Sequence, residues 1–266
     1  MPLDAARVRE ACAAWTWFPD DAAPLQTDDW LLVKFPEYAE HELSVVRFHP
    51  TGSTADALAS VLAQARRTRL PELLFWVRLG AEPDLDERLL ALGGRPEETL
   101  DVLALDLAAG VPDTGRVDAA VELVWIDDVE TLRAAHEVFV AVFGGEVPPP
   151  ARLEVEALQT SIDRRAGLGG ALVALLDGEP VGAAGLTVAD DGTSRLWSGA
   201  VLPHARGRGV YRALLGARLA YGAEQGSPLA LVKGRVESSG PILRRCGFTA
   251  YGEERSYLLP LGPARA

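Results

Sequence analysis

Apolar and polar positions follow clear periods in the second half of the chain. Over residues 129–143 and 210–224, apolar side chains recur every three or four positions, which predicts two helices. Short apolar runs bounded by turn residues predict strands, and the turn at residues 177–180 joins two of them in a hairpin. The remaining predicted elements are strands at 121–126, 171–176, 181–188, 196–202, 229–233 and 256–261, and helices at 153–165 and 241–246.

The first half of the chain carries a weaker version of the same pattern. It predicts helix, strand, helix and strand at residues 58–68, 73–78, 86–92 and 100–107. These elements overlay the end of the second half, which suggests a tandem repeat, although any two α/β domains can share such an ending. Small and turn-forming residues separate the halves. We therefore predict an N-terminal domain at 1–110, a linker at 111–119 and a second domain at 120–266.

Composition agrees with two packed domains. The 266 residues are 48% apolar and 24% charged, which suffices for a core. The formal net charge of −12 repels nucleic acid and anionic lipid, so we expect neither as a partner. The same charge favours a cationic substrate, or it simply keeps the protein soluble. The sequence does not indicate an oligomeric state.

The sequence lacks the patterns that are typical of a metal site, a signal peptide or a membrane span. The two cysteines and four histidines are scattered without the spacing of a metal site. The first residues lack the basic and apolar regions of a signal peptide, and no apolar run approaches 18 residues. We expect a cytoplasmic protein without a bound metal.

The most informative segment connects a predicted strand to the helix at 210–224. It reads Arg206-Gly207-Arg208-Gly209 and opens the helix at Val210. Unpaired backbone N–H groups and the macrodipole at a helix N-terminus form an anion site that suits a pyrophosphate. Glycine lets the backbone approach the phosphates closely. Arg208 and Arg212 can add guanidinium contacts to the same anion.

Other phosphate-binding motifs do not fit this segment. No Gly-Lys-Ser/Thr follows, as a Walker-type loop requires. A dinucleotide-binding motif would need glycine at Arg212. A purely structural turn remains the alternative for the two glycines.

Together with its surroundings, the segment resembles the GNAT acetyltransferase superfamily. That family's loop reads Val-x-Pro-x-x-Arg/Gln-x-x-Gly-x-Gly/Ala, and the chain supplies Val201, Pro203, Arg206 and Gly209 in register. The predicted helix that ends in Gly247-Phe248 resembles a second family landmark. The resemblance covers about residues 121–261. It implies a GNAT α/β fold, with a mixed, mostly antiparallel sheet flanked by helices, in two tandem GNAT-like domains.

The resemblance also implies acetyl-CoA as the acyl donor. The backbone of Ala200 and Val201 would pair with the pantetheine arm, between two splayed strands. The pyrophosphate would bind the backbone of residues 206–212. The implied coenzyme-binding residues are Ala200, Val201, Arg206, Gly207, Arg208, Gly209, Val210, Tyr211 and Arg212.

Several positions depart from the family pattern. Tyr211 replaces a small residue, but its backbone N–H can still donate, so binding survives if the ring turns outward. Leu243 stands where many relatives have a tyrosine acid. The strand before the loop has no glutamate to serve as base. Glu237 and Glu146 are the remaining candidate bases, and Tyr251 is a candidate acid. Each of the two glutamates can equally be a solvated surface group, and an ordered water can replace the base.

The first half has residues 45–53 at the corresponding place, without the Arg-x-x-Gly-x-Gly spacing. We expect this half to bind no coenzyme and to supply sheet contacts or one wall of the acceptor site. Four tryptophans can line such a wall or pack in the core: Trp15, Trp17, Trp30 and Trp76.

The sequence therefore predicts an N-acetyltransferase in which an amine of a small molecule or protein attacks acetyl-CoA directly. Two alternatives remain open. The protein can be a non-catalytic acyl-CoA-binding or regulatory module, or it can transfer another acyl group to a non-amine acceptor.

Overall fold

The computed structural model describes residues 3–262, in which strands from both halves form one sheet. The order of this 11-stranded sheet is β1-β2-β3-β4-β11-β5-β10-β9-β8-β7-β6. The first half contains α1 (Ala5–Ala13), β1 (Ala23–Gln26), β2 (Trp30–Lys34), β3 (Leu43–Phe48), α2 (Thr54–Arg67), β4 (Glu72–Val77), α3 (Leu85–Ala91), β5 (Arg95–Asp106) and a short 3₁₀ turn, η1 (Leu107–Ala109).

The second half follows the predicted order of elements closely. It contains β6 (Val121–Trp125), α4 (Val129–Phe143), α5 (Pro150–Arg165), β7 (Gly169–Leu176), β8 (Glu179–Val188), β9 (Thr193–Val201), η2 (Pro203–Ala205), α6 (Val210–Glu224), β10 (Leu229–Arg235), α7 (Ser239–Arg245) and β11 (Thr249–Pro260). The predicted helices at 129–143 and 210–224 have the observed bounds. In the first half, α1, β1, β2 and β3 were not predicted.

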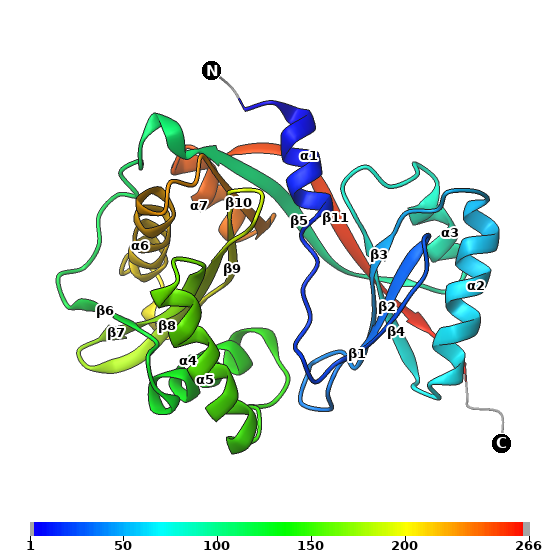
Figure 1. Cartoon of the computed structure of the whole chain (residues 1–266), viewed down its shortest axis with the longest axis horizontal. Helices are drawn as coiled ribbons and strands as arrows, with labels where there is room; N and C mark the ends of the chain where they lie inside the picture. The colour runs from blue at the N-terminus through cyan, green and yellow to red at the C-terminus, as the bar shows by residue number, and fades with distance from the viewer. Residues whose placement is uncertain (1–2, 263–266) are drawn as a thin grey trace.

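The last strand of each half lies in the sheet of the other half (Figure 1). β5 pairs with β10, and β11 pairs with β4 and β5. Asp101 on β5 pairs with Arg244 on α7, while Arg255 on β11 pairs with Asp86 on α3. The strand expected to close the second half therefore forms, but it completes the first half. The division at residues 1–110 and 120–266 stays a prediction, and each half needs a strand from the other.

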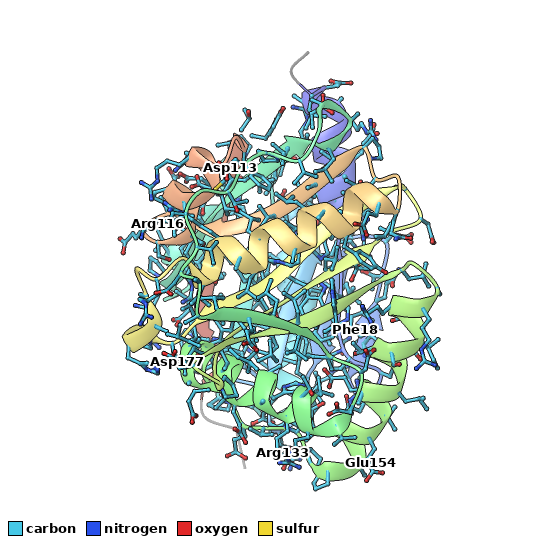
Figure 2. All side chains as sticks on the ribbon, turned by 90° about the vertical axis from the view of Figure 1, so that its left-hand side faces the viewer. Phe18, Asp113, Arg116, Arg133, Glu154 and Asp177 are labelled. Atoms are coloured by element: carbon cyan, nitrogen blue, oxygen red, sulfur yellow. The ribbon has the colours of Figure 1, made fainter. Side chains whose placement is uncertain are left out.

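Helices cover both faces of the sheet in the second half. On one face, α6 and α7 pack on alternate strand residues such as Leu196 and Val232. On the other face, α4 and α5 pack on Val173 and Ala183, and α1 packs on Leu231. Residues 111–119, the predicted linker, contain no helix or strand. Figure 2 shows this segment, with Asp113 and Arg116, passing along α6 on the outside of the molecule.

Candidate functional site

Two neighbouring strands separate in the middle of the sheet. β9 and β10 are paired in parallel only as far as Leu196 and Val232, although both strands continue. Beyond that point β9 has a bulge, where the register against β8 shifts and Ser198 takes a φ of 49°. The separation exposes main-chain groups of β9, and it lies where the resemblance places the pantetheine arm.

A buried arginine holds this bulge. Arg218 on α6 is 1% exposed, and its guanidinium donates to the carbonyls of Leu214, Gly185 and Trp197 at 3.1 to 3.3 Å. The bonds to Gly185 on β8 and Trp197 on β9 connect both strands to α6 at the bulge. The Arg218 side chain thereby fixes the position of β9 beside the separation.

The turn from β9 to α6 ends at an uncapped helix N-terminus. Gly209 is the N-cap with a φ of 82°, no side chain accepts from the first turn, and that turn has no acid. A Cβ on Gly209 would lie 2.6 Å from the carbonyl oxygen of Arg116, so glycine is required here. Within residues 3–262, the amides of Gly207, Val210 and Tyr211 donate to no acceptor. These free donors and the helix dipole suit an anion.

A cleft of about 950 Å³ connects the separated strands with this turn. Seven of the nine predicted coenzyme-binding residues line it: Val201, Arg206, Gly207, Gly209, Val210, Tyr211 and Arg212. Ala200 is buried beside the cleft and does not line it. The side chain of Arg208 turns to Asp118, and its hydrogen bond to that carboxyl holds the pKa of Asp118 below its usual range. The predicted guanidinium contact from Arg208 is thus engaged elsewhere, whereas Arg212 faces the cleft.

The cleft is basic although the protein is acidic. Six cationic side chains line it, against the two carboxylates of Glu40 and Glu98. The cations are Arg206, Arg212, Arg218, Lys233, Arg235 and Arg245. Of these, Arg235 pairs with Glu98. The local charge therefore favours an anionic ligand, which the formal net charge of −12 does not reveal.

The ring of Tyr211 lies inside the cleft and does not turn outward. Its Cε2 atom lies 2.9 Å from the position of a Cβ on Gly199, and the ring packs near Ile242 of α7. Burial raises the pKa of the phenol, while the neighbouring Arg218 charge acts to lower it. A ligand arm that follows β9 has to lie beside this ring.

None of the three predicted catalytic side chains lines the cleft. Glu237 and Glu146 are exposed, in the segments after β10 and after α4. The Tyr251 hydroxyl donates to the carbonyl of Leu3 at 3.1 Å, on the side of the sheet covered by α1. The structure does not bring these residues together and places none of them at the separated strands.

The first half supplies one wall of the cleft. Trp15, Trp17 and Trp76 line it, and Trp17 is 70% exposed, whereas Trp30 lies in the core of the first half. Phe143 of α4 lies on the same cleft. Large exposed aromatic side chains in a cleft are typical of ligand contacts.

Arg218 and Lys233 are among the cleft residues that sequence reasoning missed. Arg218 follows the glycine-rich turn on a helix with a regular apolar pattern, so nothing local marks it as buried. Lys233 did carry a signal, because it is one of only two lysines in the chain.

Over residues 3–262, no three His, Cys, Asp or Glu side chains gather as a metal site requires. No helix in the same part of the chain is long and apolar enough to cross a membrane.

Comparison with known proteins points to one family. Residues 124–248 match the Acetyltransferase (GNAT) family, and a search of curated proteins found no match. A GCN5-related N-acetyltransferase from Sphaerobacter thermophilus is 18% identical, with a TM-score of 0.65, and the match covers 91% of this chain and 84% of that one. A second from Kribbella flavida is 17% identical, with a TM-score of 0.63 and coverage of 97% and 96%.

A tandem GNAT protein from the clavulanic acid biosynthesis pathway is also similar. It is 17% identical, with a TM-score of 0.62 over 97% of this chain and 89% of that one. At such identities the likeness shows the fold alone. It nevertheless extends over both halves of the chain, so the GNAT fold predicted from the sequence is confirmed.

Proposed function

Residues 124–248 belong to the GNAT acetyltransferase family, and from this premise we propose that the protein is an N-acetyltransferase that uses acetyl-CoA. The acceptor is an amine of a small molecule or of a protein, and it attacks the thioester directly. We also propose that the two halves are tandem GNAT-like domains, of which only the second binds the coenzyme, and that the enzyme works in the cytoplasm.

One observation carries the proposal: an uncapped helix N-terminus opens into a basic cleft beside two separated strands. The free amides at the start of α6 fit a diphosphate, and Arg206 and Arg212 supply charge next to them. The main chain of β9 at Ala200 and Val201 is available to a pantetheine arm, because β9 is unpaired on the β10 side there. Although the Tyr211 ring lies in the cleft, the Tyr211 amide makes no bond within residues 3–262 and can still donate to the diphosphate, so the residues present fit the coenzyme.

Bound in this way, acetyl-CoA supplies the activated acyl group. The protein holds the diphosphate at the helix and aligns the arm along β9, which removes much of the entropic cost of the encounter. Backbone N–H groups near Val201 polarise the thioester carbonyl and stabilise the oxyanion that forms on attack.

The acceptor occupies the part of the cleft between Trp15, Trp17 and Trp76 and the separated strands. These aromatic walls suit an amine with a flat apolar body. The acceptor site then belongs to both halves of the chain, which explains why the first half is present although it binds no coenzyme.

Acetyl-CoA binding tests the proposal directly. Isothermal titration should give saturable binding at micromolar to low millimolar concentration. S-acetylpantetheine, which keeps the thioester but lacks the diphosphate, should bind far more weakly. Thiol release should follow when primary amines such as 2-phenylethylamine are added. No binding at millimolar acetyl-CoA would exclude the proposal.

A non-catalytic acyl-CoA-binding module is the second candidate. It is favoured by the positions of Glu237, Glu146 and Tyr251, all of which lie outside the cleft. Binding of acetyl-CoA without turnover over a broad amine panel would support it. Turnover with an alcohol or with another acyl-CoA, detected by mass spectrometry of the products, would instead indicate a different acyl group or acceptor.

A further inference from the structure

Lys233 stands at the point where the separated strands open. It directly follows Val232, the last residue of β10 that pairs with β9. Its side chain lies on the sheet face that α1 covers and lines the cleft beside Trp15 and Trp76. The Nζ atom lies 5.1 Å from the centre of the Trp15 ring, and the side chain keeps 16% of its exposure.

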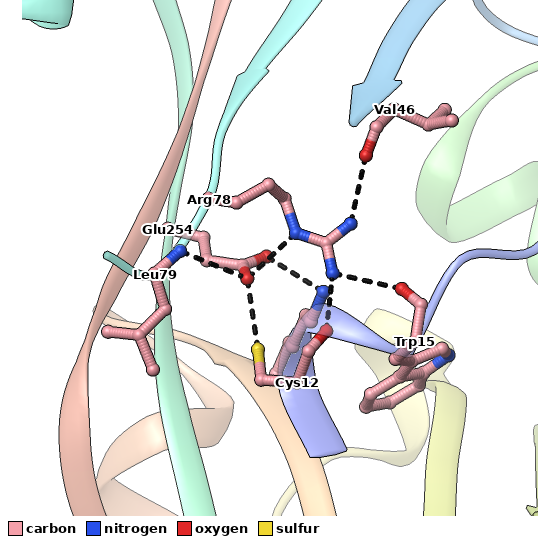
Figure 3. A network of polar contacts seen from close by, with 7 residues as sticks. Cys12, Trp15, Val46, Arg78, Leu79 and Glu254 are labelled. Carbon is pink, nitrogen blue, oxygen red and sulfur yellow. Dashed lines mark hydrogen bonds and ion pairs between the residues drawn. The ribbon is translucent and has the colours of Figure 1, made fainter. Parts of the chain in front are cut away.

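A buried carboxylate, Glu254 of β11, is the ion-pair partner of this lysine. Figure 3 shows Glu254 together with Arg78 and Cys12. Glu254 is 1% exposed and accepts from Arg78 Nε at 2.9 Å, from the Leu79 amide at 3.3 Å and from the Cys12 thiol at 3.0 Å. The Lys233 Nζ atom lies 2.7 Å from its other oxygen. Arg78 also donates to the carbonyls of Val46, Cys12 and Trp15.

The charges in this cluster do not balance if Lys233 is protonated. Arg78 is always charged, and Cys12 stays a neutral thiol because burial raises its pKa to about 11. Burial acts to raise the pKa of Glu254 as well, but the charges of Lys233 and Arg78 hold it below its usual value. Two cations would then share one carboxylate away from water. A neutral Lys233 leaves the Arg78–Glu254 pair balanced.

The surroundings of Lys233 favour its neutral form. Burial lowers its pKa, Glu254 opposes this, and Arg78 adds to the lowering, so the pKa lies below its ordinary value. The charged and titratable groups that face it are Glu254 from β11, Arg78 after β4 and Cys12 from α1. On its own strand, Arg235 is paired with Glu98.

The choice of lysine at this position is informative. Of the 26 Lys and Arg residues, only Lys34 and Lys233 are lysines. Arginine is the better partner in a buried ion pair, and it cannot lose its proton at accessible pH. In a chain that otherwise uses arginine, a lysine beside a buried carboxylate at the cleft indicates a requirement for a group that can be neutral.

We propose that Lys233 is the general base of the acyl transfer and takes the proton from the acceptor's ammonium group. This rests on the proposed function. The neutral Lys233 amine accepts one proton from R–NH₃⁺, which leaves R–NH₂ free to attack the thioester carbonyl. The new Lys233 ammonium is stabilised by Glu254, 2.7 Å away, and passes its proton to water before the next turnover.

A titration of the two lysines provides the first test. In protein labelled with ¹³C at lysine, only two side-chain signals appear, and a K34R variant assigns them. Lys34 is exposed and serves as the internal reference. We expect Lys233 to titrate at lower pH than Lys34. Titration of Lys233 together with Lys34, or above it, would overturn the proposal.

The second test is turnover of Lys233→Arg, with Lys34→Arg as the matched control. Arginine is permanently charged and can still pair with Glu254, but it cannot accept a proton. We expect kcat with acetyl-CoA and the best amine of a panel that includes 2-phenylethylamine to fall about 100-fold or more. The Kd for acetyl-CoA should stay unchanged, which shows that the cleft is intact. The thermal midpoint should fall somewhat, because Arg78 and a second permanent charge then share one buried carboxylate. K34R should behave as wild type.

The pH profile separates a base from a structural cation. In wild type, kcat/KM should fall as pH drops below the Lys233 pKa, because the amine is then protonated. In K233R this limb should move up to the pKa of the acceptor itself, about 10 for a lysine-like amine. If K233R turns over as fast as wild type, only the role of Lys233 is wrong. If wild type binds acetyl-CoA and acylates no amine, the proposed function fails with it.

Discussion

The two halves of the molecule build the same strand-to-helix turn in opposite ways. In the first half, β3 leads to α2, whose N-cap Ser53 accepts from the Asp56 amide at 3.3 Å, and Asp56 puts an acid in the first turn. In the second half, β9 leads to α6, which starts at Gly209 without a side-chain cap or an acid. A helix N-terminus that is satisfied by its own chain has little left for an anion. The same element with its amides free is a binding site.

The two halves also differ at the point where two neighbouring parallel strands separate. β3 and β4 are paired only at Ser44–Leu74 and Val45–Phe75, much as β9 and β10 part early. The Arg78 side chain after β4 then crosses to the carbonyl of Val46 at 3.0 Å. In the first half, the Arg78 side chain therefore bridges the two strands, whereas within the described residues no such bond crosses the gap between β9 and β10. The first half thus has the same strand arrangement, but its own side chains bond to groups that the second half leaves free.

Substitution of the N-cap glycine of α6 should have the largest effect on acetyl-CoA binding. Gly209→Ala forces a side chain onto a φ of 82° and places its Cβ 2.6 Å from the carbonyl oxygen of Arg116. The turn must shift, and the amides lose their direction, so we expect acetyl-CoA to bind about 100-fold more weakly by calorimetry. Gly52→Ala, in the other turn, is the control, because a Cβ there meets nothing within 4 Å. Equal losses in both variants would contradict the assignment.

The sequence predicted most of the second half because its elements are defined locally. The periodicity over residues 129–143 and 210–224 gave the observed bounds of α4 and α6, and the Asp177–Gly178 turn gave the β7–β8 hairpin. The exchange of β5 and β11 was not predictable in this way. An apolar strand pattern indicates burial but does not indicate which neighbour the strand pairs with.

The candidate site was predictable only where it depends on the local backbone. The glycine pattern predicts the β9–α6 turn, and seven of nine predicted coenzyme-binding residues line the cleft. Candidate catalytic groups depend instead on contacts between distant segments. Lys233 meets Glu254, Arg78 and Cys12 only after both halves have folded, and Tyr251, which looked suitable in sequence, lies on Leu3.

A reversed charge in the first turn of α6 tests whether the difference between the two helix N-termini determines acetyl-CoA affinity. Arg212 occupies the position in α6 that Asp56 has in α2, three residues after the N-cap. Arg212→Asp places an acid in the first turn of α6, as Asp56 does in α2. There the negative charge opposes the helix dipole's attraction for phosphate. We expect acetyl-CoA affinity to fall about tenfold to thirtyfold, consistent with the loss of a charge-assisted hydrogen bond.

The loss from Arg212→Asp should shrink as salt is added, because salt screens charges at an accessible site. Arg9→Asp on the exposed face of α1 changes the net charge equally and should leave affinity unaltered. A similar loss in both variants would mean that overall charge, and not the helix terminus, governs binding.

We expect the smallest effect from a substitution in the β3–α2 turn. The side chain of Ser53 should contribute to folding and not to acetyl-CoA binding. Ser53→Ala removes the acceptor of the Asp56 amide, which should lower the free energy of unfolding by about 1 kcal/mol in urea titrations. Acetyl-CoA affinity should not change. Ser60→Ala is the matched control, since Ser60 lies on the exposed face of α2 beyond its first turn and does not line the cleft. If Ser53→Ala weakened acetyl-CoA binding while Ser60→Ala did not, the first half would take part in coenzyme binding, and the contrast between the two helix N-termini would fail.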